Sequence, residues 1–261
     1  MRRLLFACLL LSPAALRAQD SYPDEPVNRF RFSGGAVIYS DSFWQPVQDR
    51  RNRFFTANAV ESPGRPKTFN FAGKAELSRD YPSGLSIMGG LEGAIGIDRD
   101  SQRVTDSTSQ LLSRILLLPL SSARISATTQ LYTLGLNAGL GYNFRLSETR
   151  RHILKPFVLA GIGRAWFKED WEISEGIFTI GGRSIDVEFR DQTTYYSLGL
   201  GLEWSPHPNI FFQVQHGWRA MNFDSVSRNV RTNTALIADP SEDNATNLKG
   251  SFWDFRIGAQ F

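Results

Sequence analysis

The chain has 261 residues, with 29 Lys and Arg against 26 Asp and Glu, and its single cysteine is Cys8. Residues 1–18 have the charged start, the short apolar run and the small-residue end of a cleaved signal peptide. Without them the chain keeps 26 basic and 26 acidic side chains and no cysteine. The alkaline pI therefore gives no indication of a nucleic-acid partner, and a disulfide or thiolate metal site is excluded.

Residues 19–28 are polar and include Pro23 and Pro26, so they are predicted to form a short periplasmic leader. The remaining residues, 29–261, suit a single domain. No stretch of them reaches about 18 consecutive apolar residues, so the sequence predicts no transmembrane helix. A secreted chain of this kind is periplasmic, extracellular or a barrel in the outer membrane.

Apolar and polar side chains alternate in eight segments. A period of two places the apolar side chains on one face of a β-strand and the polar ones on the other. The predicted strands are Arg29–Tyr39, Lys67–Ser78, Leu85–Asp98, Gln130–Arg145, Lys155–Lys168, Thr193–Trp204, Ile210–Trp218 and Ser251–Phe261. Their connections alternate between long ones of roughly 22–31 residues and short ones of about 5–9, an asymmetry typical of outer-membrane barrels.

The last segment ends the chain on an aromatic residue, with apolar side chains at Trp253, Phe255, Ile257 and Phe261. It resembles the closing strand of small outer-membrane β-barrel proteins of the OmpA/OmpX type, which ends in Phe after alternating apolar positions. The resemblance covers nearly the whole mature chain through its strand pattern. It implies an all-β fold, an eight-stranded antiparallel up-and-down transmembrane β-barrel with long extracellular loops and short periplasmic turns. It also implies that Phe261, Ile257 and Phe255 form a signal for the barrel-assembly machinery.

Aromatic side chains gather near both ends of the predicted strands. Two such belts, a strand length apart, are typical of the two interfaces of a membrane. The predicted membrane-interface aromatics are Tyr142, Phe144, Trp204 and Phe261 near the short turns, and Tyr132, Trp218 and Trp253 near the long loops.

If the apolar faces point to lipid, the opposite faces line the barrel. The predicted lumen residues are the basic Arg29, Arg31, Lys74, Arg164 and Arg256 and the acidic Glu76, Glu92, Glu203 and Asp254. An eight-stranded barrel has space for side chains and little else. Because buried charge is tolerated only when it is paired, the balance favours a plugged, ion-paired lumen over an open pore. The alternative is a gated ion path in which Glu92, Glu203 and Arg256 exchange partners.

Candidate catalytic chemistry is scarce in this sequence. His216 lies near the outer end of the seventh predicted strand, where an enzyme acting on lipid would work. Lipid A deacylases of similar architecture use a His followed two residues later by a Ser, whereas Trp218 stands at that position here. No HExxH motif, glycine-rich phosphate loop or cysteine pair occurs. The sequence therefore predicts a protein that is not an enzyme, without a cofactor or a metal site.

Two parts of the long connections are distinctive. Residues 111–120 (LLSRILLLPL) are apolar, and we consider an extension of the hairpin above the membrane, a lipid contact at the interface or a partner site. If this segment entered the membrane as strands, the barrel would have ten strands instead of eight. Residues 169–191 are predicted to contain a small hairpin around Gly181 and Gly182.

Three functions are compatible with this architecture. The first is a non-enzymatic outer-membrane protein that acts through its extracellular loops in adhesion, surface protection or envelope integrity. The second is a narrow porin-like channel for small or apolar solutes, and the third is an enzyme that modifies lipid A. The expected partners are outer-membrane lipid, the barrel-assembly machinery and an extracellular ligand bound by the loops, with no nucleic acid.

Overall fold

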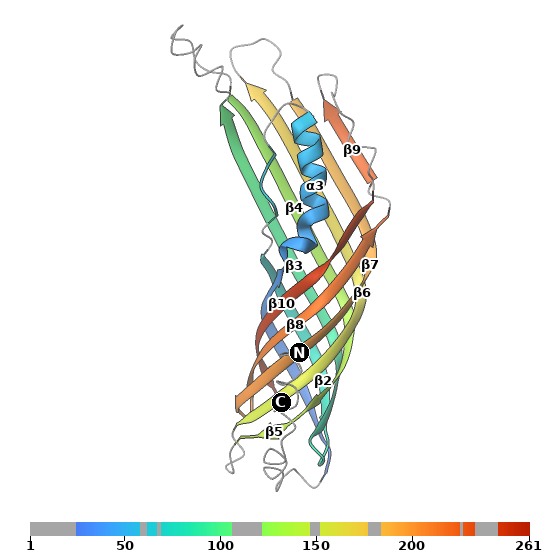
Figure 1. The fold of residues 1–261 in the computed structure, drawn as a ribbon. Coiled ribbons are helices and arrows are strands. Elements are labelled where there is room, and N and C mark those ends of the chain that lie inside the picture. Colours follow the sequence, from blue (N-terminus) through green and yellow to red (C-terminus); the bar gives the residue numbers. More distant parts are fainter. Residues whose placement is uncertain are drawn as a thin grey trace, which may run out of the picture.

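The computed structural model describes residues 25–57, 62–66, 69–105, 122–146, 152–176, 184–224, 227–232 and 245–261. Eight long antiparallel strands form a closed barrel (Figure 1). They are β1 (Val27–Tyr39), β2 (Phe69–Asp80), β3 (Leu85–Thr105), β4 (Ser122–Tyr142), β6 (Ile153–Gly176), β7 (Ser184–His207), β8 (Ile210–Phe223) and β10 (Thr246–Gln260). Each strand pairs with its neighbours in this order, and β10 pairs with β1, which closes the ring. The predicted all-β, eight-stranded antiparallel barrel is confirmed.

The barrel closes through the last residue of the chain. In the β1–β10 ladder Arg31 lies opposite Gln260 and Tyr39 lies opposite Phe252. Beyond the ladder, Phe261 and Phe30 exchange two backbone hydrogen bonds, with N···O distances of 2.9 and 3.0 Å. The Phe261 side chain is 75% exposed on the outer surface. Its backbone therefore helps to close the ring, whereas its side chain lies outside it.

The side chain and the backbone of Phe261 can therefore be tested separately. Phe261→Ala is expected to lower the amount of barrel in the outer membrane strongly while leaving the urea midpoint of the refolded protein almost unchanged. Deletion of Phe261 should also lower the midpoint, because two hydrogen bonds worth about 1 kcal/mol each are lost. Immunoblots of membrane fractions and urea titrations measure the two effects. Leu200→Ala, at another exposed apolar position on β7, is the control, and wild-type membrane levels of Phe261→Ala would contradict the recognition role.

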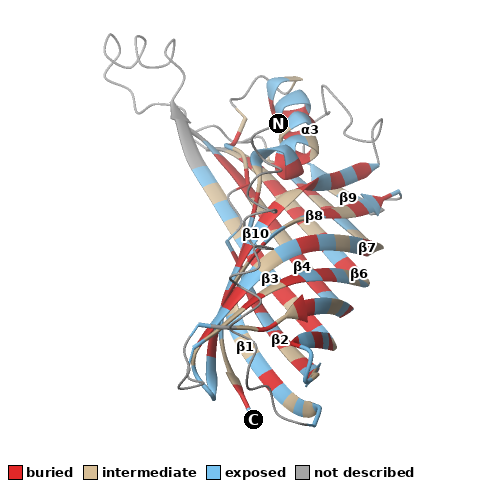
Figure 2. Ribbon diagram, turned by 60° about the horizontal axis from the view of Figure 1, so that its bottom comes forward, coloured by how far each residue is buried: buried red, intermediate tan, exposed pale blue. Residues whose placement is uncertain are grey.

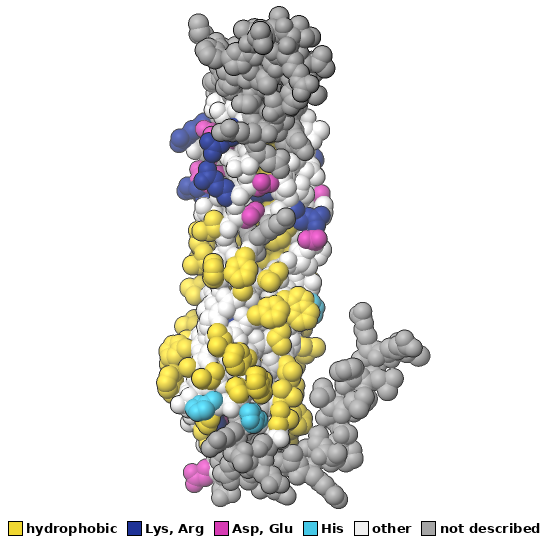
Figure 3. Space-filling view, turned by 90° about the vertical axis from the view of Figure 1, so that its left-hand side faces the viewer, with side chains coloured by type: hydrophobic (Ala, Val, Ile, Leu, Met, Phe, Trp, Pro, Cys, Tyr) yellow, Lys and Arg dark blue, Asp and Glu magenta, His cyan; other side chains and the backbone are white. Residues whose placement is uncertain are grey.

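The outer surface carries a broad apolar band. Exposed large apolar side chains project from all eight strands, among them Leu91, Leu136, Leu200 and Ile257. On the face seen in Figure 3 apolar side chains cover much of the barrel wall, and most of the charged side chains lie above them. Residues that alternate with the band are buried inside the barrel (Figure 2). A closed sheet with an apolar exterior satisfies all its backbone groups internally, which is the condition for crossing a bilayer. The protein is therefore an outer-membrane barrel.

Four strands continue well above the apolar band. The prediction that residues 99–129 and 169–191 are connections between the barrel strands is wrong in part, because β3, β4, β6 and β7 extend into them. Above the band apolar and polar side chains still alternate with a period of two, but they exchange faces. Apolar side chains such as Ile125 and Trp171 are buried inside, whereas polar ones such as Thr128 and Asp170 lie on the outer face. The outer face of this part meets solvent instead of lipid, so the polar side chains lie outside.

Two predictions about the long connections fall largely outside the described residues. The apolar segment 111–120 lies there entirely. Of the predicted small hairpin, residues 177–183 lie there too, and Ile185–Phe189 belongs to β7 as a continuation of the barrel strand. The ring formed by the described residues has eight strands.

A helix, α3 (Asp41–Ala57), follows β1 within a stretch for which no regular structure is predicted. Figure 1 shows it at the upper end of the barrel, in front of the extended strands. Phe43 stacks on Tyr39 with ring centroids 4.0 Å apart, and Phe54 lies 4.9 Å from the Trp171 ring. The inward apolar side chains of the extended strands thus form a water-excluding core with α3. No helix in the described part of the chain is long and apolar enough to cross a bilayer.

Two short strands complete the sheet. β5 (Phe144–Arg145) pairs with the start of β6, and β9 (Ser227–Thr232) pairs with β7 above the band. The β2–β3 turn ends on Gly84, whose φ of 90° favours glycine. The β7–β8 turn has only two residues between the strands, Pro208 and Asn209. Short turns at one end and longer connections at the other place the second end outside the cell.

Candidate functional site

The lower part of the lumen holds a buried ion-pair chain. Arg31 donates to Glu76 at 2.6 Å and to Glu203 at a shorter distance, and all three side chains are almost fully buried. Lys74 pairs with the same Glu76, and Lys155 lies 3.3 Å from Glu203. Two carboxylates thus bind three cations. The five groups come from four different strands, so the chain ties the barrel wall together across its interior.

The upper part of the lumen is organised around Glu92. It accepts hydrogen bonds from Arg219 at 2.9 Å, from the Tyr195 hydroxyl at 3.2 Å and from Arg256 at 3.5 Å. Asp254 binds Arg256 more closely, at 2.6 Å. The five side chains come from β3, β7, β8 and β10, and all are buried. Charges in this setting are costly unless they are paired, and here each has a partner.

Eight of the nine predicted lumen residues line the interior. They are Arg29, Arg31, Lys74, Glu76, Glu92, Glu203, Asp254 and Arg256. Arg29 lies at the lower end, where it pairs with Asp80 at 3.0 Å and is part-exposed.

Arg164 was wrongly placed in the lumen. It is exposed on the outer face of β6, between the outward Ile162 and Trp166. Lys155 and Glu169 lie an odd number of residues away and are buried on the inner face of the same strand. Between them β6 offers mainly small or apolar residues on both faces, so its local pattern does not fix the phase. The odd sequence separation between Arg164 and the inward Lys155 would have placed Arg164 on the outer face.

Three ionic groups of the lumen were missed. Lys155 and Asp80 lie at the ends of predicted strands, and Arg219 was assigned to a loop because the predicted strand ended at Trp218. Arg219 is buried, donates to the Tyr39 hydroxyl at 2.7 Å and lies over the Tyr195 ring. A slightly longer predicted strand would have placed it on the same face as the inward Gln213 and Gln215.

Above the band, a third ionic cluster joins α3 to the barrel wall. Glu169, on β6, is completely buried and accepts hydrogen bonds from Arg50 at 2.7 Å and from Arg51 at 2.5 Å. Arg51 also donates to the Gly64 carbonyl at 2.8 Å. Burial by itself would raise the pKa of Glu169, but the guanidinium groups of Arg51 and Arg50 outweigh it and lower the pKa. Both arginines come from the same helix, so this single carboxylate holds α3 in the mouth of the barrel.

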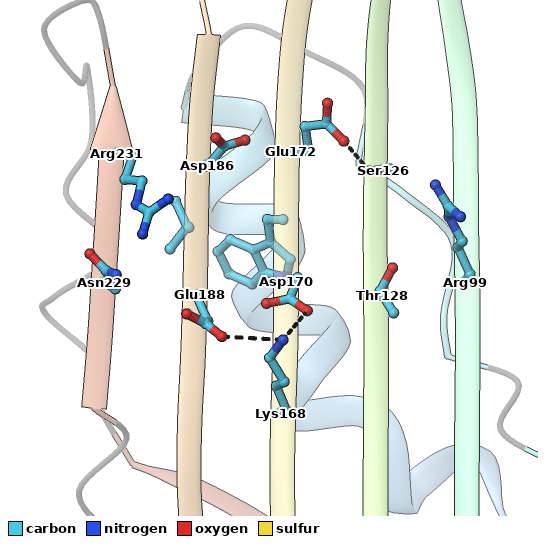
Figure 4. A pocket seen from close by; sticks show the side chains of 12 residues that line it. Arg99, Ser126, Thr128, Lys168, Asp170, Glu172, Asp186, Glu188, Asn229 and Arg231 are labelled. Atoms are coloured by element: carbon cyan, nitrogen blue, oxygen red, sulfur yellow. Dashed lines mark hydrogen bonds and ion pairs between the residues drawn. The ribbon is translucent and has the colours of Figure 1, made fainter.

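The outer face of the extended strands carries a polar groove of ≈ 370 Å³, shown in Figure 4. The labelled charged side chains project from the sheet on the side away from α3. Lys168 contacts Asp170 at 2.8 Å and Glu188 at 3.2 Å, and Ser126 donates to Glu172 at 3.2 Å. The charged side chains lining this extracellular groove are Arg99, Lys168, Asp170, Glu172, Asp186, Glu188 and Arg231.

Carboxylates face each other across β6 and β7 in the extracellular groove. Asp170 lies opposite Glu188, and Glu172 lies opposite Asp186. Like charges in this arrangement repel, and Lys168 offsets one of the two pairs. Its hydrogen bond with Asp170 raises the pKa of Lys168 in spite of partial desolvation. Among the described residues, no group of three or more His, Cys, Asp or Glu side chains is arranged to hold a metal ion.

The predicted interface aromatics lie on the outer surface. Trp204, Trp218, Trp253 and Phe261 are exposed, and Tyr132, Tyr142 and Phe144 are partly exposed. Phe255 and Ile257 are exposed on the outer face of β10. His216 is also outward, with its ring 4.5 Å from that of Trp253.

No protein-family model matches the chain, and no curated protein matches its sequence. Three solved structures that match are those of outer-membrane proteins. The attachment invasion locus protein Ail of Yersinia pestis, in complex with the heparin analogue sucrose octasulfate, has 15% identity and a TM-score of 0.32, over 91% of this chain and 99% of that one. A major outer membrane protein of Thermus thermophilus has 12% identity and a TM-score of 0.43, over 90% and 100%. Neisserial surface protein A has 11% identity and a TM-score of 0.35, over 90% and 97%.

Proposed function

We propose that this protein is a non-enzymatic outer-membrane barrel with a plugged lumen that binds an extracellular ligand at its polar groove. The observation that carries this proposal is the contrast, above the band, between a filled interior and a hollowed outer surface. The interior is occupied by α3 and by paired charges, whereas the exterior presents a hollowed polar surface. A protein built in this way acts on its surroundings through its outer surface.

Three layers support the plugged lumen. The chain around Arg31, the cluster around Glu92 and the clamp on Glu169 lie one above another along the barrel. An ion that passed through would have to separate buried pairs at each layer, which costs several kcal/mol for each pair. A solute would in addition have to displace α3, whose apolar side chains are buried against the wall.

The extracellular groove supports adhesion to a partner with positively charged segments. Its lining contains four carboxylates against Lys168, Arg99 and Arg231. It lies on strands, which hold the carboxylates at fixed spacings of about 5 Å across the sheet. An extended segment with Lys or Arg at alternate positions would match this spacing. The ligand we propose is therefore a basic stretch of an extracellular protein.

The surroundings of His216 support the proposal that the protein has no catalytic activity. His216 packs on the Trp253 ring, and the residue two positions later, Trp218, has no nucleophilic group. A hydrolytic mechanism of the deacylase type needs a hydroxyl activated by that imidazole. We therefore propose an interfacial role for His216.

The plugged lumen is tested by conductance in planar lipid bilayers with the refolded protein. We expect no large, stable openings at moderate voltage. The mouth variant Glu169→Gln, which loosens α3, should still conduct little, because the two lower layers remain intact. Large, stable openings of the wild-type protein would overturn the proposal in favour of the narrow channel.

Adhesion is tested on whole cells that display the protein. Cells should bind to immobilised polylysine-rich peptides, and the binding should fall several-fold in the triple variant Asp170→Asn, Asp186→Asn, Glu188→Gln. Glu25→Gln, at an exposed position before β1 at the opposite end of the barrel, is the control. Equal binding by the wild type and the triple variant would show that the groove is not the binding surface.

A further inference from the structure

Arg164 occupies an unusual position for a charged side chain. It lies on the outer face of β6, directly between Leu134 on β4 and Thr194 on β7. Outward Ile162 precedes it by two residues along the strand, and Trp166 follows it by two. Arg164 makes no ion pair with any described residue. A charge facing lipid is costly, and a long side chain reduces that cost by extending toward the polar interface.

Directly above Arg164 the outer face has a hollow of ≈ 530 Å³, separate in its aromatic part from the extracellular groove. Tyr132, Trp166 and Gln192 lie side by side on three neighbouring strands. The next row outward consists of Gln130, Lys168 and Arg190. The residues of these two rows line this aromatic hollow, together with Phe167 and Asp191.

Three side chains follow one another on the outer face of β6, a cation, an aromatic ring and a second cation. Arg164, Trp166 and Lys168 share the outer face, and at about 3.3 Å per residue they span roughly 13 Å. This distance covers the upper edge of the apolar band and the first polar row above it. Lys168 is already bound to Asp170 and Glu188, and Glu188 also accepts from Arg190 at 2.6 Å. Arg164 is thus the cation most available to an external anion.

The donor set identifies a class of ligand. Flat aromatic faces such as those of Trp166 and Tyr132 suit the apolar faces of sugar rings. The amides of Gln130 and Gln192 suit sugar hydroxyls. A guanidinium binds phosphate in a bidentate manner and is favoured for that purpose. The hollow lies at the upper edge of the apolar band, the level where the headgroups of the outer leaflet begin, and Arg164 lies two residues below Trp166 on the same face of β6.

We infer that the aromatic hollow binds the phosphorylated sugar headgroup of an outer-leaflet glycolipid. Arg164 extends upward to the phosphate, Trp166 and Tyr132 contact the sugar ring, and the acyl chains lie along the apolar band below. The aromatic and amide groups of this site take no part in the extracellular groove, and Lys168 is the one residue that lines both.

The inference is tested by measuring binding of lipid A and of its dephosphorylated form to the refolded barrel in detergent, by native mass spectrometry. We expect the wild type to prefer the phosphorylated lipid about tenfold. Arg164→Gln should remove most of this preference, and Trp166→Leu should weaken binding of both lipids several-fold. Lys249→Gln, an exposed cation at the outer end of β10, is the matched control and should change little. Heat-modifiable gel migration establishes that each variant is folded.

Three results would overturn the inference. They are equal affinity of the wild type for the two lipids, an unchanged preference in Arg164→Gln, and an equal loss in Lys249→Gln. Competition with inorganic phosphate at millimolar concentration distinguishes a site for a free phosphate ion from a site for the lipid headgroup. Phosphate should displace lipid A only slightly, because it lacks the sugar. Complete displacement would show that the hollow binds a phosphate ion only, and the headgroup assignment would fail.

Discussion

Glu169→Gln is expected to release α3 from the mouth of the barrel while leaving the membrane-spanning ring intact. The substitution removes the carboxylate that binds both Arg50 and Arg51, and it leaves both charges buried, with that of Arg50 beside the rings of Phe167, Trp171 and Phe189. Removal of one partner from a buried ion pair costs about 3–5 kcal/mol. A single helix docked on a wall loses a large part of its docking free energy through such a change.

Limited proteolysis measures this release. Trypsin should cleave the refolded variant within α3, at Arg50 or Arg51, under conditions in which the wild type resists. The heat-modifiable migration of the barrel should be unchanged. Asp170→Asn, at the neighbouring position on the outer face of β6, is the control and should stay resistant. A resistant Glu169→Gln variant would show that apolar packing alone holds the helix.

Acidification should act on the same cluster only at low pH. The pKa of Glu169 is lowered in the folded protein, so its contribution to docking is complete above the pKa of an unfolded glutamate, about 4.3. The contribution is lost as the pH falls through the lowered folded pKa. Trypsin is inactive in this acidic range, so pepsin is the suitable protease. Resistance of α3 should persist at pH 5 and decline below the unfolded value.

Glu92→Gln should lower the stability of the barrel by about 3–5 kcal/mol. Glu92 is the shared acceptor of Arg219, Arg256 and Tyr195 inside the membrane-spanning part. Arg256 keeps the carboxylate of Asp254 after the change, whereas Arg219 loses the one carboxylate that it binds among the described residues. Arg219 then keeps two neutral acceptors, the Tyr39 hydroxyl and the amide oxygen of the new glutamine. The cost therefore arises mainly from the guanidinium of Arg219, which cannot reach water.

Urea unfolding of the refolded protein in lipid vesicles measures this loss. Glu188→Gln, which removes the part-exposed pairs with Lys168 and Arg190, is the control and should change the unfolding free energy by less than about 1 kcal/mol. The double variant Glu92→Gln, Arg219→Gln should recover part of the loss, because no unpaired charge remains. Unchanged stability of Glu92→Gln together with new conductance would support the gated ion path instead.

Strand periodicity was sufficient to predict most of the membrane-spanning barrel. In segments such as Gln130–Arg145 the apolar side chains recur at every second position over a whole strand. The same period predicted the inward faces of β1, β2 and β10, and with them the positions of Arg31, Lys74 and Arg256. It failed for Arg164, because small residues on both faces of β6 left the phase undetermined.

Helix α3 was not predicted from the sequence because of its composition. Phe43, Trp44, Val47, Phe54 and Phe55 follow a helical spacing, but they stand among charged residues and beside a proline in the second turn. Arg50 and Arg51 suggest a solvated segment when they are read in the sequence alone. They are buried only because Glu169, more than a hundred residues later, lies opposite them.

By itself, the sequence determined the compartment, the eight strands and the polarity of the barrel wall. Each of these follows from local patterns, since a period of two is a property of a short segment. The tertiary structure decided which charges meet, where the alternation changes phase and what fills the mouth. These depend on register around a closed ring and on the level at which lipid gives way to water, and neither is encoded in a single strand.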